Sequence, residues 1–297
     1  MAIHRAEVAS VRRLSETMTR VTLHGDGLAG FTSTGAGDEY VRVFLPHGTD
    51  RGELSLPEPV DGGGWRTPEG RPEAPMRTYT IRAVRPEAGE VDIDFVRHDH
   101  GAASEWAAAA RPGDPVGLTG PTALYRPPAD LAWQLLVTDL TGLPAAARLL
   151  EQTPEGVRSR TVVEVPGPSS RLELPARPGD SVTWEYGGNG HGPSRLAELV
   201  AARVPHGADL TGGYVWVAGQ TGELRTVRRY LRKELGLATD RFKVVGYWMP
   251  EADSWRRRYD ALPAEVKTEL TEMWEKPTVD TEDLNLTYEE RLGALGL

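Results

Sequence analysis

The chain has no cysteine among its 297 residues. This absence excludes disulfides, thiolate-bound zinc, iron–sulfur clusters and cysteine nucleophiles. Any redox chemistry in this protein must therefore use an organic cofactor or a metal held by histidine and carboxylate side chains. Small domains without disulfides or structural metal need a core of their own, and this length suffices for two such domains.

Long hydrophobic runs are also missing. No apolar stretch approaches the roughly 18 residues that a membrane helix requires. Hydrophobic residues make up 39% of the chain and charged residues 26%, which is the balance of a globular protein. The N-terminal ten residues carry Arg5 and Glu7 and lack the apolar core of a signal peptide. We therefore expect a cytoplasmic protein that does not insert into a membrane.

The chain also lacks an excess of basic residues, and its formal net charge is −9. Phosphate contacts need a basic surface, so a general nucleic-acid binder is disfavoured. We expect a monomer of two domains, the first over residues 1–126 and the second over 127–297.

Alternating apolar and polar residues dominate the first part of the chain. The clearest case is Val91-Asp92-Ile93-Asp94-Phe95, in which three apolar side chains face one way and two aspartates the other. Several such strands between turn residues predict a small antiparallel β-barrel. An alanine-rich segment at 102–110 predicts one short helix, which the following Arg111-Pro112-Gly113 ends. Glycine, proline and charge crowd residues 51–75, and we expect a long mobile loop there.

After Pro127 short apolar strands alternate with helical stretches, which predicts a parallel sheet with helices on its faces. Ligands of such sheets bind beyond the carboxyl ends of the strands, so Thr138-Asp139 and Gly219-Gln220-Thr221 are candidate binding loops. The expected strands are 134–137, 160–165, 181–185, 214–218 and 243–246, and the expected helices are 144–150, 193–202, 222–234, 264–274 and 288–295.

The motif Arg77-Thr78-Tyr79-Thr80 lies on a predicted strand of the barrel. A flavin site needs an arginine for the pyrophosphate, a tyrosine to cover the isoalloxazine ring and a hydroxyl near its N5 atom. Alternation places Arg77 and Tyr79 on one face of the strand. A strand with ordinary polar side chains would show the same four residues, so the motif by itself leaves both interpretations open.

A second motif follows at residues 98–106, where His98-Asp99-His100 end a strand and Gly101-Ala102-Ala103-Ser104 begin a helix. Free N–H groups at such a helix N-terminus can bind a pyrophosphate, and Ser104 can add a hydroxyl. A plain helix cap is the alternative. A metal site is disfavoured, because adjacent strand residues point to opposite faces and cannot all converge.

The sequence resembles the siderophore-interacting proteins, which are FAD-dependent ferric-siderophore reductases of the wider ferredoxin-reductase superfamily. The resemblance covers nearly the whole chain. It rests on Arg77-Thr78-Tyr79-Thr80-Ile81-Arg82, the segment 91–106, Gly113-Asp114 with Gly120-Pro121, Leu143-Pro144-Ala145-Ala146-Ala147-Arg148, Val163-Glu164-Val165-Pro166, Val215-Trp216-Val217-Ala218-Gly219 and Gly246-Tyr247-Trp248.

The resemblance implies a fold, two cofactors and a substrate. The fold is an N-terminal FAD-binding β-barrel followed by a nucleotide-binding α/β domain with a parallel sheet and a C-terminal helical tail. NADH or NADPH is the electron donor and a ferric siderophore the substrate. FAD binding is implied for Arg77, Thr78, Tyr79, Thr80, His98, His100, Gly101, Ala102, Ala103 and Ser104, and the nicotinamide pocket for Thr138, Asp139, Gly219, Gln220 and Thr221. Tyr247 and Trp248 are implied to close near the flavin.

The second domain departs from the family pattern at two positions. The family usually carries Asp-Glu-Thr where this chain has Asp139-Leu140-Thr141, and often an acidic residue where Gln220 stands. Asp139 is equally consistent with a helix cap, and Trp248 with a core residue. No basic cluster follows the strand that ends near Glu164, which favours NADH over NADPH.

Two other functions remain open from the sequence. The protein could reduce another acceptor, such as a ferredoxin or a monooxygenase partner, or it could bind a siderophore or flavin without turnover. Electron transfer from nicotinamide to flavin to ferric iron demands no general acid or base, so no catalytic residue is assigned. No pattern identifies the siderophore.

Overall fold

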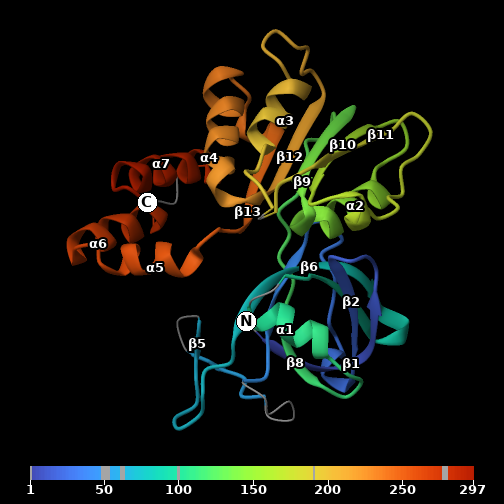
Figure 1. Cartoon of the computed structure of the whole chain (residues 1–297), viewed down its shortest axis with the longest axis vertical. Helices are drawn as coiled ribbons and strands as arrows, with labels where there is room; N and C mark the ends of the chain where they lie inside the picture. Colours follow the sequence, from blue (N-terminus) through green and yellow to red (C-terminus); the bar gives the residue numbers. More distant parts are fainter. Residues whose placement is uncertain (1, 48–53, 61–63, 99–100, 190, 276–279) are drawn as a thin grey trace. The chain divides into compact units, whose positions relative to one another are not determined.

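A computed structural model describes residues 2–47, 54–60, 64–98, 101–189, 191–275 and 280–297. The chain forms two compact units (Figure 1). The first consists of Met1–Arg126 with Leu143–Thr153 and Gly167–Pro175, and the second of Pro127–Gly142, Pro154–Pro166 and Ala176–Leu297. Two segments that follow residue 126 in sequence thus belong to the first unit.

The first unit is a closed antiparallel barrel, as the sequence predicts. Its strands follow the order β1-β2-β7-β6-β3-β8 around the barrel. The short helix α1 (Ala102–Ala109) follows β7, and Figure 1 draws it in green beside the barrel strands. The strands are β1 (Ile3–Arg13), β2 (Met18–His24), β3 (Tyr40–Phe44), β6 (Met76–Arg85), β7 (Glu90–Val96) and β8 (Pro115–Thr119).

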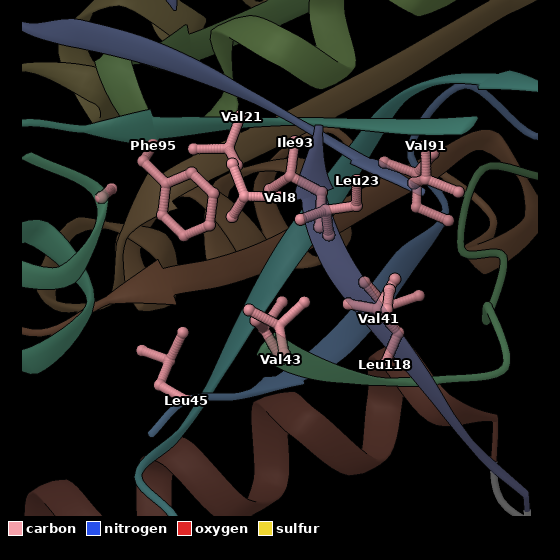
Figure 2. Packing of buried hydrophobic residues seen from close by; sticks show 14 of the residues in the cluster. Val8, Val21, Leu23, Val41, Val43, Leu45, Val91, Ile93, Phe95 and Leu118 are labelled. Carbon is pink, nitrogen blue, oxygen red and sulfur yellow. The ribbon is translucent and has the colours of Figure 1, made fainter. Parts of the chain in front are cut away.

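Alternation along β7 separates the barrel core from its charged outer face. Ile93 lies opposite Val21 of β2 and is fully buried with it. Figure 2 shows the apolar side chains of several strands gathered in this core, including Val8, Val41 and Leu118. The alternation in the sequence predicts this arrangement, because residues two apart on a strand share a face.

The aspartates of β7 lie on the other face, among arginines. Asp94 accepts two hydrogen bonds from Arg20, at 2.6 and 2.8 Å. Asp92 accepts two from Arg85, at 2.8 and 2.7 Å, and one from Thr22 at 2.8 Å. These pairs satisfy two carboxylates that are only 4% exposed.

The segment 51–75 is not simply a mobile loop where the structure describes it. It contains two short paired strands, β4 (Glu58–Pro59) and β5 (Trp65–Arg66). The Trp65 ring packs edge-on against Phe44 of β3 with centroids 5.8 Å apart, and the Arg42 guanidinium lies 5.1 Å from the centroid of the Trp65 ring. An aromatic anchor and a cation–π contact therefore hold this glycine-rich segment to the barrel.

The second unit is built on a parallel sheet of five strands in the order β11-β10-β9-β12-β13, which confirms the predicted α/β class. Helices α3 (Leu196–Arg203) and α4 (Thr221–Arg229) contribute Leu196, Val200, Leu224 and Val227 to an apolar core with the sheet. A π-helical turn, Tyr230–Glu234, continues α4. The strands are β9 (Trp133–Asp139), β10 (Arg158–Val165), β11 (Ser181–Tyr186), β12 (Gly213–Gln220) and β13 (Phe242–Trp248).

Helix α2 (Leu143–Gln152) follows β9 in sequence, yet it packs on the barrel strand β6. Arg148 is buried and donates to the carbonyl of Ile81 at 3.0 Å. Arg82 of β6 pairs with Glu151 near the other end of the helix, at 2.5 Å. These contacts explain why α2 belongs to the first unit.

The described part of the tail contains the helices α5 (Ala252–Asp260), α6 (Ala264–Glu272) and α7 (Thr281–Ala294). The sequence predicts α6 and the end of α7 but not α5. Asp280 caps α7 by accepting from the N–H of Glu282 at 2.8 Å. Charged contacts attach α7 to α4, because the buried Arg228 pairs with Glu282 and Glu289.

Candidate functional site

The predicted flavin strand is the first half of β6. Arg77 and Tyr79 lie opposite Val43 and Val41 of β3, so they share the face that becomes the barrel core further along the strand. Thr78 and Thr80 therefore lie on the other face. The structure thus brings the arginine and the tyrosine together and places the two hydroxyl side chains apart from them.

Tyr79 connects the strand to helix α1 through a row of aromatic rings. The centroids of the Tyr79 ring and of the Phe95 ring of β7 lie 4.3 Å apart. The Phe95 and Trp106 ring centroids lie 5.6 Å apart, and Trp106 belongs to α1. Burial raises the pKa of Tyr79 to about 12, so the hydroxyl stays protonated at neutral pH. The row links the two motifs that the sequence analysis could relate only by their order.

Arg77 keeps an exposed guanidinium at the start of β6. It donates to the carbonyl of its neighbour Met76 at 2.8 Å. Among the described residues no carboxylate forms an ion pair with it, in contrast to Arg20, Arg82 and Arg85 nearby. An exposed arginine without a carboxylate partner is suited to an anionic ligand such as a diphosphate.

Ser104 of α1 hydrogen-bonds to a residue that lies between β7 and the helix. Its hydroxyl is buried, donates to the carbonyl of His98 at 2.8 Å and accepts from the N–H of His98 at 3.0 Å. Both bonds engage the hydroxyl with the backbone of His98. Among the described residues no side chain caps the N-cap Gly101, which has φ 115°, but the Glu105 carboxylate accepts from the Gly101 N–H at 3.2 Å. His100 lies outside the described residues, and Ala102 and Ala103 form the first turn of α1.

The carboxyl edge of the parallel sheet holds the second group of predicted residues. Thr138 and Asp139, at the end of β9, are both 0% exposed. The Thr138 hydroxyl donates to the carbonyl of Ala218 at 2.7 Å. Both side chains are thus buried at the carboxyl edge, and their expected role in a nucleotide pocket stays a prediction.

Asp139 joins three strand ends. Its Oδ1 accepts from the N–H and the hydroxyl of Thr141, at 2.8 and 2.6 Å, as a helix cap would. Its Oδ2 accepts from the indole N–H of Trp248 at 2.6 Å, and the carboxylate also accepts from the N–H of Gln220. Burial raises the pKa of Asp139, and the bonds from Thr141 and Trp248 oppose that rise. The residue is thus a cap, one of the two alternatives left open by the sequence, and it also binds Trp248.

Thr221 and Tyr247 complete this edge. The Thr221 hydroxyl donates to the carbonyl of Trp248 at 2.9 Å. Gly219 pairs with Gly246, but Gln220 pairs with Trp248, so Tyr247 is an extra residue in β13. Such a bulge redirects the side chains around it. The structure therefore brings Gly219, Gln220, Thr221, Tyr247 and Trp248 together at one edge.

Sequence reasoning did not single out the carboxylate of Glu164, at the end of β10. It is 1% exposed and accepts from the Ser194 hydroxyl at 2.9 Å and from the N–H of Arg195 at 2.7 Å. Burial raises the pKa of Glu164, and the bonds from Arg195 and Ser194 oppose that rise. Its place at a strand end beside Asp139 was the available signal.

The described residues contain no group of three or more histidine, aspartate or glutamate side chains placed to hold a metal ion. Nor does any helix within those residues have the length and apolarity needed to cross a membrane.

Comparison with known proteins identifies both units. The siderophore-interacting FAD-binding domain matches residues 7–125, and the siderophore-interacting protein domain matches residues 131–251. The ferric vibriobactin reductase ViuB of Vibrio cholerae is 30% identical over 79% of this chain and 85% of its own length. The NADPH-dependent ferric-chelate reductase of Escherichia coli is 31% identical over 81% of this chain and 91% of its own.

Solved structures agree with these matches. A siderophore utilization protein from T. fusca has a TM-score of 0.72 and 33% identity, over 84% of this chain and 94% of that one. The ferredoxin reductase of carbazole 1,9a-dioxygenase, at a TM-score of 0.58 and 17% identity over 83% of this chain and 70% of that one, shares the fold alone. With both domain models in order along its sequence, this chain belongs to the siderophore-interacting protein family.

Proposed function

We propose that this protein is an FAD-dependent reductase that transfers electrons from NAD(P)H to a ferric siderophore. The observation that carries the proposal is that the residues of the barrel match an FAD-binding domain. The relatives of the chain also include two named ferric reductases. A barrel followed by a parallel sheet is also the layout of reductases that take electrons from nicotinamide nucleotides, as in phthalate dioxygenase reductase.

The barrel carries groups that fit FAD. The diphosphate is anionic, and it would find the exposed Arg77 and the N-terminus of α1. Tyr79 presents a partly exposed ring for the isoalloxazine. We propose that FAD binds to Arg77, Tyr79, Thr78 and Thr80, and to His98, His100, Gly101, Ala102, Ala103 and Ser104.

The carboxyl edge of the sheet is the proposed nicotinamide site. Gly219, Gln220 and Thr221 form the turn into α4, and Tyr247 and Trp248 end β13 beside it. Ligands of parallel sheets bind at this edge. Thr138 and Asp139 would act from beneath, because both are buried. We accordingly propose that residues 1–126 contain the FAD site and residues 127–297 the nucleotide site.

FAD, when bound, would accept an electron pair from the nicotinamide and release electrons singly to ferric iron. The protein's part is to bind the two cofactors and hold their rings in a reactive arrangement. Ferrous iron is a weaker partner than ferric iron for the hard oxygen donors of a siderophore, so reduction releases the metal. No residue needs to move a proton in this scheme.

The direct test is flavin content and reduction. We expect the purified protein to show flavin absorbance that NADPH or NADH bleaches under anaerobic conditions. Protein without flavin, or flavin that neither nucleotide reduces, would contradict the proposal. Both donors belong in the test, since the sequence favours NADH and the Escherichia coli relative is named for NADPH.

The proposal includes a cytoplasmic monomer, because reduced nicotinamide nucleotides are found in the cytoplasm and one chain carries both proposed sites. Gel filtration at several protein concentrations tests the oligomeric state, and cell fractionation tests the location. A concentration-dependent dimer or a periplasmic protein would require revision of this part alone.

A further inference from the structure

The carboxylate of Asp139 is the common acceptor for three loops at the carboxyl edge of the sheet. Thr141 follows β9, Gln220 ends β12 and Trp248 ends β13, and each donates to this one carboxylate. The group is fully buried, so water cannot replace a lost partner. Hydrogen bonds to a carboxylate are also stronger than those between neutral groups.

The backbone at this edge is shaped around the carboxylate. Gly219 has φ 154°, and a Cβ there would lie 2.6 Å from Asp139 Oδ2. Only glycine allows both this conformation and this approach. On the neighbouring strand, a Cβ at Gly246 would lie 2.9 Å from the Thr221 hydroxyl oxygen. Two glycines thus leave room for the two side chains that hold Trp248.

Trp248 is fixed at both its side chain and its main chain. Asp139 accepts from its indole N–H at 2.6 Å, and the Thr221 hydroxyl donates to its carbonyl at 2.9 Å. The bulge lies directly before it, so the position of Trp248 also determines how Tyr247 leaves the strand.

We infer that Asp139 is a positioning residue, which holds Trp248 and the bulged Tyr247 in the arrangement that orients the nicotinamide, without touching the nucleotide. The inference rests on the proposed function. A positioning role also explains why the Asp139 carboxylate is both buried and hydrogen-bonded. A carboxylate that binds a ligand would need an accessible oxygen.

The inference separates the two halves of the reaction. Orientation of the nicotinamide matters when the nucleotide reduces the flavin, and it does not matter when a ferric chelate reoxidises the flavin. A misplacement of about 1 Å can cost roughly 100-fold in rate. We therefore expect Asp139→Asn to slow flavin reduction at saturating NADPH or NADH by about tenfold or more, and to leave reoxidation by ferric citrate unchanged.

The choice of substitutions follows from the hydrogen bonds. In Asp139→Asn the amide oxygen can accept from Thr141. The amide NH2 group then faces the indole N–H of Trp248, and two donors cannot form a hydrogen bond. Trp248→Phe removes that indole donor. If Asp139 acts through Trp248, the double variant is reduced no more slowly than the slower single variant, so the two effects do not add.

A matched control is Ser159→Ala, which removes a buried 2.8 Å hydrogen bond from Gln134 at the opposite end of the same sheet. We expect this variant to lose stability and to keep both half-reactions. If Asp139→Asn does not fold, Thr221→Val tests the same idea, because it removes only the bond to the Trp248 carbonyl. It should slow the reductive half-reaction selectively.

The experiment is anaerobic stopped-flow of the FAD-loaded protein. The inference is overturned if Asp139→Asn and Thr221→Val are reduced at the wild-type rate, if they slow both half-reactions equally, or if the Asp139 and Trp248 effects simply add. A wild-type protein whose flavin is not reduced would instead contradict the proposed function.

Discussion

Arg148 of α2 forms a buried ion pair with Glu39, the residue before β3, with 2.7 Å between guanidinium and carboxylate. Glu39 is fully buried and also accepts from Ser33 and Thr34. Arg148 donates further to the Ile81 carbonyl of β6, the strand that carries the proposed FAD residues. One arginine thus attaches a helix to two elements of the barrel.

Removal of Arg148 should destabilise the barrel strongly. Arg148→Met leaves the Glu39 carboxylate buried without its cation, which costs about 3–5 kcal/mol. Denaturant unfolding measures the loss. Arg82→Ala is the matched control, because it breaks the ion pair to Glu151, a residue that is 40% exposed, and such pairs contribute about 0–1 kcal/mol. The double variant Glu39→Gln, Arg148→Met should recover part of the stability, and strictly additive losses would contradict the role of the pair.

The pH dependence of barrel stability should involve Asp92. Burial alone would raise the pKa of Asp92, but the hydrogen bonds from Arg85 and Thr22 hold it below its ordinary value. A carboxyl whose folded-state pKa is lowered stabilises the protein above its unfolded pKa of about 3.9 and loses that contribution as the pH falls through the folded value.

Asp92→Asn should therefore cost about 1–3 kcal/mol at pH 7 and less at pH 3. Urea unfolding at both pH values measures the difference. Glu90→Gln, which removes a more exposed partner of the same Arg85, serves as the control and should change little. A difference for Asp92→Asn that stays constant between the two pH values would contradict this assignment.

Arg77 should determine how tightly FAD is held. Loss of a charged hydrogen bond to the diphosphate is expected to weaken FAD binding about 10- to 100-fold in Arg77→Ala. Flavin retained after dialysis, and titration of the apoprotein with FAD, give the dissociation constant. Arg12→Ala removes another exposed arginine of the barrel, on β1, and should leave the affinity unchanged. Equal affinities for Arg77→Ala and wild type would remove Arg77 from the proposed site.

Arg228 should hold α7 in place. It is 3% exposed and pairs with Glu282 and Glu289, while Lys243 also pairs with Glu282 at 2.7 Å. Arg228→Met would leave the buried Glu282 and the partly buried Glu289 undercompensated, so we expect α7 to exchange its amide hydrogens much faster. Arg291→Ala, whose partner Glu269 is half exposed, should preserve the protection of α7. Unchanged protection in Arg228→Met would show that apolar contacts suffice.

Local patterns predicted most of the secondary structure. Apolar and acidic residues alternate from Val91 to Phe95 because one face of β7 meets the core, and five residues suffice to show this pattern. The short apolar runs that form the strands of the parallel sheet are also visible in the local sequence. Helix α5 escaped prediction because none of its residues is buried and most of its side chains are charged.

Contacts between distant residues escaped prediction as well. Nothing local shows that Arg148 would pair with Glu39, or that Trp65 would bind a glycine-rich segment to Phe44. The sequence places Asp139 at the carboxyl end of a strand, as the structure has it, but its burial depends on Gly219 and Trp248, which are far away in sequence. Sequence reasoning therefore identified the edge of the sheet but not which of its side chains are buried.

The most direct test of the central claim is single-turnover electron transfer to a ferric siderophore. Protein with bound FAD is reduced anaerobically by NADPH or NADH, mixed with ferric siderophore and a ferrous-specific chromogenic chelator, and followed by absorbance. Return of the flavin absorbance together with formation of the ferrous complex is the predicted result. Reduced flavin that ferric siderophores fail to reoxidise would contradict the claim and favour a different electron acceptor.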